Sequence, residues 1–291
     1  MSVARQETQS GFALLDQRAR PRAHARYSEN SLRALVPQTL LQMKRLLVRW
    51  SRDLTMVILT FVVPIFFLVT VNTVLGDQIS EITGHSALFG SVPMVAVVAA
   101  ITGSSAGAIG LMRERADGLL ARLWVLPVHR ASGVLSRLAA EAVRILLTTV
   151  VIVCAGLALG FRFHEGLIAG LLWLIVPVIF GVAFATLVTT AAFYSAASAA
   201  QPGTTLVEGI ALVCTLGIFF CTGFVPLAQY PEWIRSFVEQ QPMSHAIEAM
   251  RGLSQGGPIL GPIIATLLWA VGTVAVCVVP MVLGYRKASM R

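Results

Sequence analysis

The sequence is short of charge. Only 12% of its 291 residues are Asp, Glu, Lys or Arg, which is about half the fraction found in soluble domains. Residues 1–53 contain 14 of the 36 charged residues, so the other 238 residues share only 22. This scarcity excludes a soluble enzyme with a water-facing surface all around, a disordered chain and a nucleic-acid-binding domain. It indicates an integral membrane protein.

The sequence also lacks the common motifs of nucleotide and metal chemistry. It contains no G-x-x-x-x-G-K-[ST] segment, its four cysteines have no C-x-x-C spacing and its five histidines have no H-E-x-x-H spacing. We therefore expect neither a nucleotide nor a metal cofactor in this chain. The first fifty residues lack the early apolar core of a secretory signal.

Long apolar runs are what the sequence does have. A membrane-crossing helix needs about 20 mostly apolar residues, because lipid offers the backbone no hydrogen-bond partners. Arg144 and Arg162 bound the third run, and we expect their side chains to extend to the two membrane surfaces. The prediction is an all-α membrane protein with six spans, at residues 54–75, 86–111, 145–161, 167–194, 205–226 and 259–284.

The basic residues predict the orientation. Residues 1–53, 112–144 and 285–291 contain 19 of the 22 Lys and Arg residues. Because Lys and Arg concentrate on the cytoplasmic side, these segments are expected inside, in the cytoplasmic (inner) membrane with both termini in the cytoplasm. An even number of spans satisfies this arrangement.

The sequence divides the chain into three regions, two before the first span and one that contains all the spans. Residues 1–30 are polar and are predicted to be a disordered cytoplasmic tail. In residues 31–53, apolar side chains recur every three or four positions between basic ones, which predicts an amphipathic helix in the cytoplasmic interface. Residues 54–291 form the predicted transmembrane domain. Pro37 is expected to separate the amphipathic helix from a preceding turn.

The loop 112–144 is predicted to form two short helices. Pro127 ends the first, and Ser132 is a candidate N-cap for the second. Composition alone leaves two interpretations open: a basic loop resting on lipid headgroups, or a transverse helix that docks on a cytoplasmic partner.

Residues 227–255 are predicted to form an external helical hairpin, interfacial or re-entrant. Pro231 suits a first helical turn, and Pro242 breaks that helix. Ser244 is expected to cap the second helix, and Gly256–Gly257 to end it. Each helix is about ten residues long, too short to cross.

Two patterns resemble reactive sites. Gly103-Ser-Ser-Ala-Gly107 matches G-x-S-x-G, but it lies within a predicted span with no strand before it, and it also matches the helix-contact pattern GxxxG. Glu208 is identified as the only carboxylate within a span or at its edge. Such a group is a functional candidate, although a hydrated carboxylate at a helix start is the simpler interpretation.

The chain resembles the ABC-2 type exporter permeases over residues 31–291. The resemblance rests on the six spans and the preceding amphipathic helix, and on three sequence features. The first is the loop Met112-RERADGLLARLWVL-Pro127. The second is Gly223-Phe-Val-Pro226 followed by Tyr230-Pro-Glu-Trp233, and the third is Gln241-Pro242 followed by Ala249-Met-Arg251. Within that family it is similar to the daunorubicin/doxorubicin-resistance permeases. The runs 119–133, 160–167 and 240–252 resemble the C subunit of exporters of phthiocerol dimycocerosate lipids.

This resemblance implies partners and roles. The loop after the second span would be the coupling helix that rests on a cytoplasmic ATPase subunit, present in two copies, which would hold ATP and Mg. A second permease subunit would complete a homo- or heterodimer. The implied coupling residues are Arg113, Glu114, Arg115, Gly118, Leu119, Leu120, Leu123, Trp124 and Pro127.

The resemblance also implies a substrate pathway along spans one, two and five. Its candidate residues are Phe61, Phe66, Phe67, Glu208, Phe219 and Phe220. The expected cargo is a complex lipid or lipophilic drug that is moved outward. Three alternatives stay open: export of a polysaccharide or other glycolipid, an intramembrane lipid-modifying enzyme using Ser104, Ser105 or His164 with Glu165, and a scaffold that recruits an ATPase or synthase.

Overall fold

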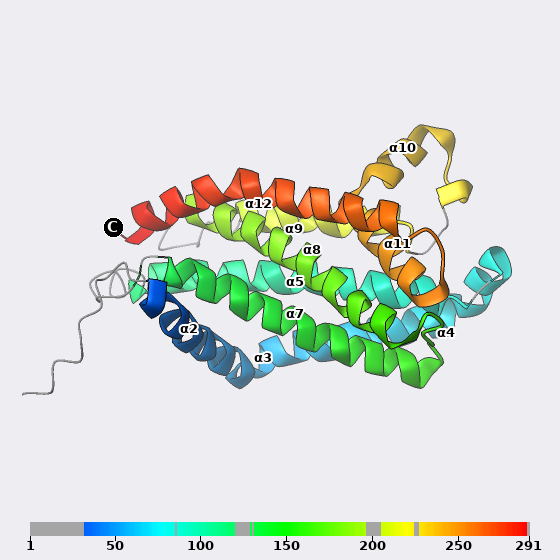
Figure 1. Ribbon diagram of the computed structural model, residues 1–291, viewed down its shortest axis with the longest axis horizontal. Coiled ribbons are helices and arrows are strands. Elements are labelled where there is room, and N and C mark those ends of the chain that lie inside the picture. Colours follow the sequence, from blue (N-terminus) through cyan, green and yellow to red (C-terminus); the bar gives the residue numbers. More distant parts are fainter. Residues whose placement is uncertain are drawn as a thin grey trace, which may run out of the picture.

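The computed structural model describes residues 32–84, 86–119, 129, 131–195, 205–223 and 227–289 (Figure 1). Nearly all of these residues are helical, and none of them lies in a β-strand. The long helices run along one another as an elongated bundle (Figure 1). The prediction of an all-α membrane protein is confirmed.

Five helical segments of the described chain are long and apolar enough to cross a membrane. In the first, a short α-helix, a π-helical turn and a long α-helix follow one another without a loop. The five are α3–η1–α4 (Leu54–Val57, Ile58–Val62 and Val63–Thr83), α5 (Leu88–Ala116), α7 (Ser132–Leu159), α8 (Gly166–Tyr194) and α12 (Leu260–Ser289).

The sixth predicted span is shorter than expected. Helix α9 (Thr205–Gly217) continues into the 3-10 turn η2 (Ile218–Phe220), after which Cys221 is extended. The apolar stretch Leu206–Phe220 is about 23 Å long at 1.5 Å per residue, whereas a bilayer core is about 30 Å thick. The sequence predicted a span over 205–226, and the helical geometry ends at Phe220.

The core of the bundle lies around α5 and α8. Helix α8 packs against α5, α7 and α12, and its Trp173 is completely buried. In the most apolar part of each span, 56% of the α5 residues are buried, compared with 17% in the first span and in α12. The first span and α12 therefore have broad apolar faces that suit contact with lipid.

Helix α2 (Leu32–Arg52) runs obliquely to the bundle and packs against α7 (Figure 1). Two glutamines fix it there: the His129 amide donates to Oε1 of Gln38 at 2.7 Å, and Nε2 of Gln42 donates to the Ser132 hydroxyl at 3.1 Å. Pro37 lies inside this helix, so the expectation that it separates the helix from a preceding turn is wrong.

The third span differs from its prediction. Helix α7 begins at Ser132 and continues without a break to Leu159. Ser132 is the first helical residue and not the predicted N-cap, which is Ala131, and its hydroxyl donates to the His129 carbonyl at 2.6 Å. The helix therefore begins well before residue 145, where the predicted span starts, and the side chain of Arg144 is enclosed by the protein and not extended away from it. Its residue exposure is only 6%, because its guanidinium is paired with Glu141 on the same helix.

The predicted hairpin of two short helices is present, with one corrected boundary. After the 3-10 turn η3 (Leu227–Gln229), α10 (Glu232–Gln240) and α11 (Pro242–Gln255) are separated by the extended Gln241. Helix α11 starts at Pro242 and not after Ser244, whose buried hydroxyl has no partner in the described chain. Because α11 packs on α5, α8 and α12, it is inserted into the bundle. Gly256, with φ +86°, ends it.

Candidate functional site

The last turns of α5 carry the first three predicted coupling residues, at the end of the bundle where α8 and α12 also end (Figure 1). We call this end the basic end. Helical geometry continues to Ala116, so Arg113, Glu114 and Arg115 belong to the long span rather than to a separate transverse helix. Gly118, with φ +69°, then turns the chain away in a conformation that favours glycine.

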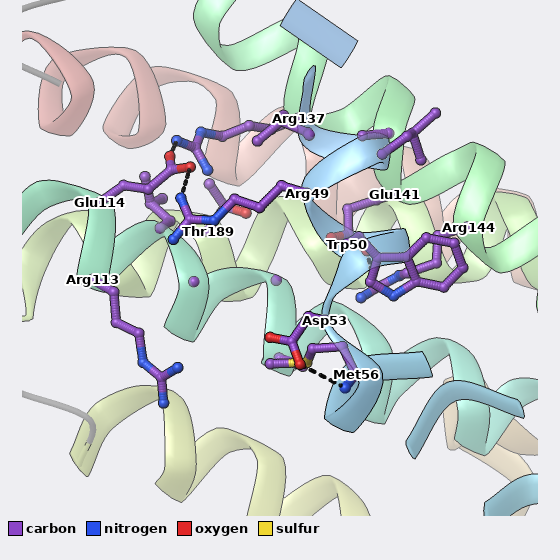
Figure 2. A pocket seen from close by; sticks show the side chains of 17 residues that line it. Arg49, Trp50, Asp53, Met56, Arg113, Glu114, Arg137, Glu141, Arg144 and Thr189 are labelled. Carbon is purple, nitrogen blue, oxygen red and sulfur yellow. Dashed lines mark hydrogen bonds and ion pairs between the residues drawn. The ribbon is translucent and has the colours of Figure 1, made fainter. Parts of the chain in front are cut away.

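Glu114 joins three helices. Its side chain is 4% exposed and accepts a hydrogen bond from Nη1 of Arg49 on α2 at 2.9 Å. Its other carboxylate oxygen pairs with Nη2 of Arg137 on α7 (Figure 2). Direct contact of this carboxylate with another subunit would require these ion pairs to open. Removing one partner of a buried ion pair costs about 3–5 kcal/mol. This cost applies to the pair with Arg137, which is 14% exposed, whereas Arg49 is 59% exposed and its pair contributes less. Glu114 is therefore a strong link between α5 and α7 and a weaker one to α2.

The two neighbouring arginines have different surroundings. Arg115 donates from Nη1 to the backbone oxygens of Phe193 and Ser195, at 3.0 and 3.1 Å. It therefore ties the end of α5 to the end of α8. Arg113 is exposed and extends away from Glu114 (Figure 2), so it is available to a partner at the basic end.

The remaining predicted coupling residues are only partly described. Leu119 is the last residue described in this segment, and it is half-buried. Leu120, Leu123, Trp124 and Pro127 lie outside the described residues.

A second buried ion pair lies deeper along α7. Glu141 and Arg144 are paired, and both side chains face the Gly103–Gly107 stretch of α5. A Cβ on Gly107 would collide with Oε1 of Glu141, and one on Gly103 would lie 2.9 Å from Nη2 of Arg144. The GxxxG pattern of α5 thus makes room for two charged side chains. Sequence reasoning missed this pair, although Glu and Arg three residues apart beside a GxxxG helix could have indicated it.

Glu114 with its two arginines and the Glu141–Arg144 pair border one cavity of about 150 Å³ between α2, α5, α7 and α8 (Figure 2). Asp53, Trp50 and Thr189 also line it. Glu208 is not the only carboxylate on a long apolar helix, because Glu114 and Glu141 lie on α5 and α7, which are long and apolar enough to cross a membrane. The spans bury these carboxylates because arginines neutralise them.

The predicted pathway residues do not meet in one place within the described chain. Phe61 packs against Trp50 of α2, with ring centroids 5.7 Å apart. Phe66 and Phe67 on α4 and Phe219 in η2 are exposed, and only Phe220 borders a large apolar cavity beside α8 and α12. Glu208 is also exposed, in the first turn of α9, where a carboxylate suits the positive end of a helix.

Comparisons with known proteins identify the family of this chain. Residues 37–253 match the family described as ABC-2 type transporter. The chain belongs to this family. It is 54% identical over 262 residues to the "Probable doxorubicin resistance ABC transporter permease protein DrrC" of two Mycobacterium tuberculosis strains, which covers 90% of this chain and 93% of the relative. It is 24% identical over 214 residues to the daunorubicin resistance ABC transporter permease protein DrrB1 of Streptomyces coeruleorubidus, with 73% of each chain covered.

The hydroxyls of this ABC-2 permease that resemble a nucleophile are engaged in helix packing. Ser104 Oγ donates to the Gly181 carbonyl of α8 at 3.3 Å, and Ser105 Oγ donates to the Ile101 carbonyl at 3.0 Å. Both serines lie within the continuous helix α5, whereas a nucleophile elbow needs a sharp turn between a strand and a helix. The backbone amide of His164 donates to the Ser254 carbonyl at 3.0 Å, which places His164 beside α11.

Proposed function

We propose that this chain is the membrane-spanning subunit of an ATP-driven exporter that moves a complex lipid or a lipophilic drug outward across the cytoplasmic membrane. The observation that carries the proposal is the 54% identity, over nearly the whole length of both chains, with a permease named for doxorubicin resistance. The resemblance to exporters of phthiocerol dimycocerosate lipids makes a lipid of that type the first cargo to test.

An ABC-2 permease works with an ABC ATPase subunit. We place two such subunits, with their ATP and Mg, at the basic end, and we place a second permease, identical or different, beside this one. The distribution of basic residues supports this orientation, because 19 of the 22 Lys and Arg residues lie in the segments assigned to that side. Both termini would then be cytoplasmic, with α10 and α11 on the outer side.

The contacts of α5 support a route for the motion. The ATPase pair would press on segment 112–127, whose first residues form the last turn of α5. Because Glu114 holds Arg49 and Arg137, a displacement of α5 would be carried to α2 and α7. Arg115 would carry it to the end of α8. The phenylalanines of the first span and of η2 would line the pathway only after such a rearrangement or beside the second permease.

Affinity purification of the tagged chain in mild detergent tests the partners. The expected result is one ABC ATPase and, for a heterodimer, a second permease. The reconstituted complex should show ATP hydrolysis that the substrate stimulates. Hydrolysis unaffected by any lipid or drug would favour the scaffold, and full transport without a nucleotide-hydrolysing partner would contradict the proposal.

A deletion strain tests the cargo. Its envelope lipids, separated into cell-associated and surface-exposed fractions, should show one complex lipid retained inside. Normal lipid exposure together with loss of a surface polysaccharide would favour the polysaccharide or glycolipid exporter instead.

A further inference from the structure

A second cavity lies within this single chain, away from the charged cluster. It has a volume of about 690 Å³ and is formed between α8, α9 and α12, with the α10–α11 junction at its outer side. Its wall is built from apolar side chains such as Phe184, Leu216 and Trp269. The volume lies in the range of about 300–1,000 Å³ that is typical of sites for small ligands.

The described lining residues include no Asp, Glu, Lys, Arg or His. The cavity at the basic end is different, because arginines and carboxylates line it. An ion moved into the larger cavity would lose its water without gaining an opposite charge, which is strongly unfavourable. The walls therefore select against charged molecules.

Three polar side chains interrupt the apolar wall. On α12, the Thr273 hydroxyl makes no hydrogen bond within the described chain, whereas Thr266 on the same helix donates to the Pro262 carbonyl at 2.8 Å. At the outer side, Nε2 of Gln241 donates to the Gly217 carbonyl at 3.3 Å, and its Oε1 has no hydrogen-bond partner among the residues that the structure describes. Gln240 beside it is exposed. These groups offer hydrogen bonds to an uncharged ligand that carries hydroxyl or ester groups.

We infer that this cavity binds an uncharged lipophilic molecule with hydroxyl or ester groups, and that it rejects the charged counterpart of the same shape. The site deepens the proposed function, on which it rests for the claim that the bound molecule belongs to the exported class. Binding itself requires neither the ATPase nor transport. The occupant is a small neutral lipid because only such a molecule uses both the apolar wall and the unpaired hydroxyl of Thr273.

The test uses the purified full-length chain in lipid nanodiscs and two photoreactive probes. Dioctanoylglycerol and dioctanoyl phosphatidic acid, each with a diazirine on one acyl chain, differ only in the phosphate. Crosslinked residues are mapped by mass spectrometry at equal probe concentrations. We expect the neutral probe to label α8, α9 and α12 residues of the cavity at least about tenfold more than the phosphate-bearing probe.

Variants test the location of the site. Ala270 faces the cavity and is 8% exposed, so Ala270→Phe fills it and should abolish labelling there. Leu268→Phe is the matched control, because Leu268 is 69% exposed on the same helix and does not line the cavity. Thr273→Val keeps the shape without the hydroxyl and should weaken labelling by about three- to tenfold. If Ala270→Phe does not fold, Ala183→Leu narrows the same cavity from α8.

Equal labelling by both probes would overturn the selection against charge. Labelling that persists in Ala270→Phe and Ala183→Leu, or that spreads over the exposed faces of α4 and α12, would show ordinary lipid contact and overturn the site. Protection of the cavity only in a dimer would assign it to a second copy of the chain and also overturn it. Specific binding without export by the assembled complex would contradict the proposed function and leave the site intact.

Discussion

Gly107 of α5 lies directly against Glu141 of α7, so that a Cβ at position 107 would occupy the space of the carboxylate oxygen Oε1. This contact lets α5 approach α7 closely enough to enclose the Glu141–Arg144 pair. The GxxxG pattern is usually associated with close contact between helices. In this protein its two glycines make room for an ion pair.

Gly107→Ala should therefore destabilise the protein. The added methyl group forces the Glu141 carboxylate away from its position and disturbs its pair with Arg144. Because the displaced atoms are the end of a flexible side chain, we expect a cost at the low end of the range for overpacking, about 1 kcal/mol. Thermal unfolding in detergent, followed by the loss of monodisperse protein, measures the change. Gly110→Ala is the control, because nothing lies within 4 Å of a Cβ at that position of the same helix, and its stability should equal or exceed that of the wild type. A Gly107→Ala protein as stable as Gly110→Ala would refute the close contact.

Glu114→Lys should abolish substrate-stimulated ATP hydrolysis and export while leaving membrane insertion intact. The substitution places a third cation beside Arg49 and Arg137 and so separates α2 and α7 from α5. Reconstituted complexes supply both measurements. Glu81→Lys is the charge-matched control, because Glu81 is exposed near the C-terminal end of α4, away from the Glu114 cluster.

A charge swap distinguishes the ion pair from the carboxylate itself. The double variant Glu114→Arg/Arg137→Glu restores one opposite-charge pair and should recover part of the coupled activity lost in Glu114→Lys. If Glu114→Lys exports normally, coupling does not pass through this residue.

Arg115→Met should loosen the end of α8. The substitution removes the two hydrogen bonds to the Phe193 and Ser195 carbonyls but retains most of the apolar stem. Hydrogen exchange measured by mass spectrometry should become at least about tenfold faster in residues 189–195, since each hydrogen bond to a charged group contributes about 1.5–3 kcal/mol. Arg113→Met, at an exposed position two residues earlier, should leave that exchange unchanged.

Ser104→Ala and Ser105→Ala should retain full export. Each hydroxyl donates to a backbone carbonyl, and the loss of such a bond costs about 1 kcal/mol of stability. The cell-surface lipid profile of each complemented strain measures the outcome. An abolished profile in a variant that is still present in the membrane would revive the intramembrane enzyme.

The sequence alone determined the class of this protein. Apolar runs of span length and an almost complete confinement of Lys and Arg to three segments required a multi-pass helical membrane protein. The spans, the amphipathic helix before them and the motifs around 112–127 and 223–251 together indicated the ABC-2 family, which the comparisons confirm. These are local properties, because length, apolarity and short motifs are read along the chain.

Only the tertiary structure decided where the buried charges lie. Arg49 and Glu114 are 65 positions apart, and no local pattern shows that α2 crosses α5 at this point. Periodicity predicts which residues share a face of one helix, but it does not identify the residue opposite on another helix. For this reason Arg144 was expected at a membrane surface and was found buried, and α11 was found packed into the bundle. A charge is excluded from an apolar core only while it is unpaired. Glu141 and Arg144 pair within one helix, but the residues that enclose the pair, Gly103 and Gly107 of α5, are distant in the sequence.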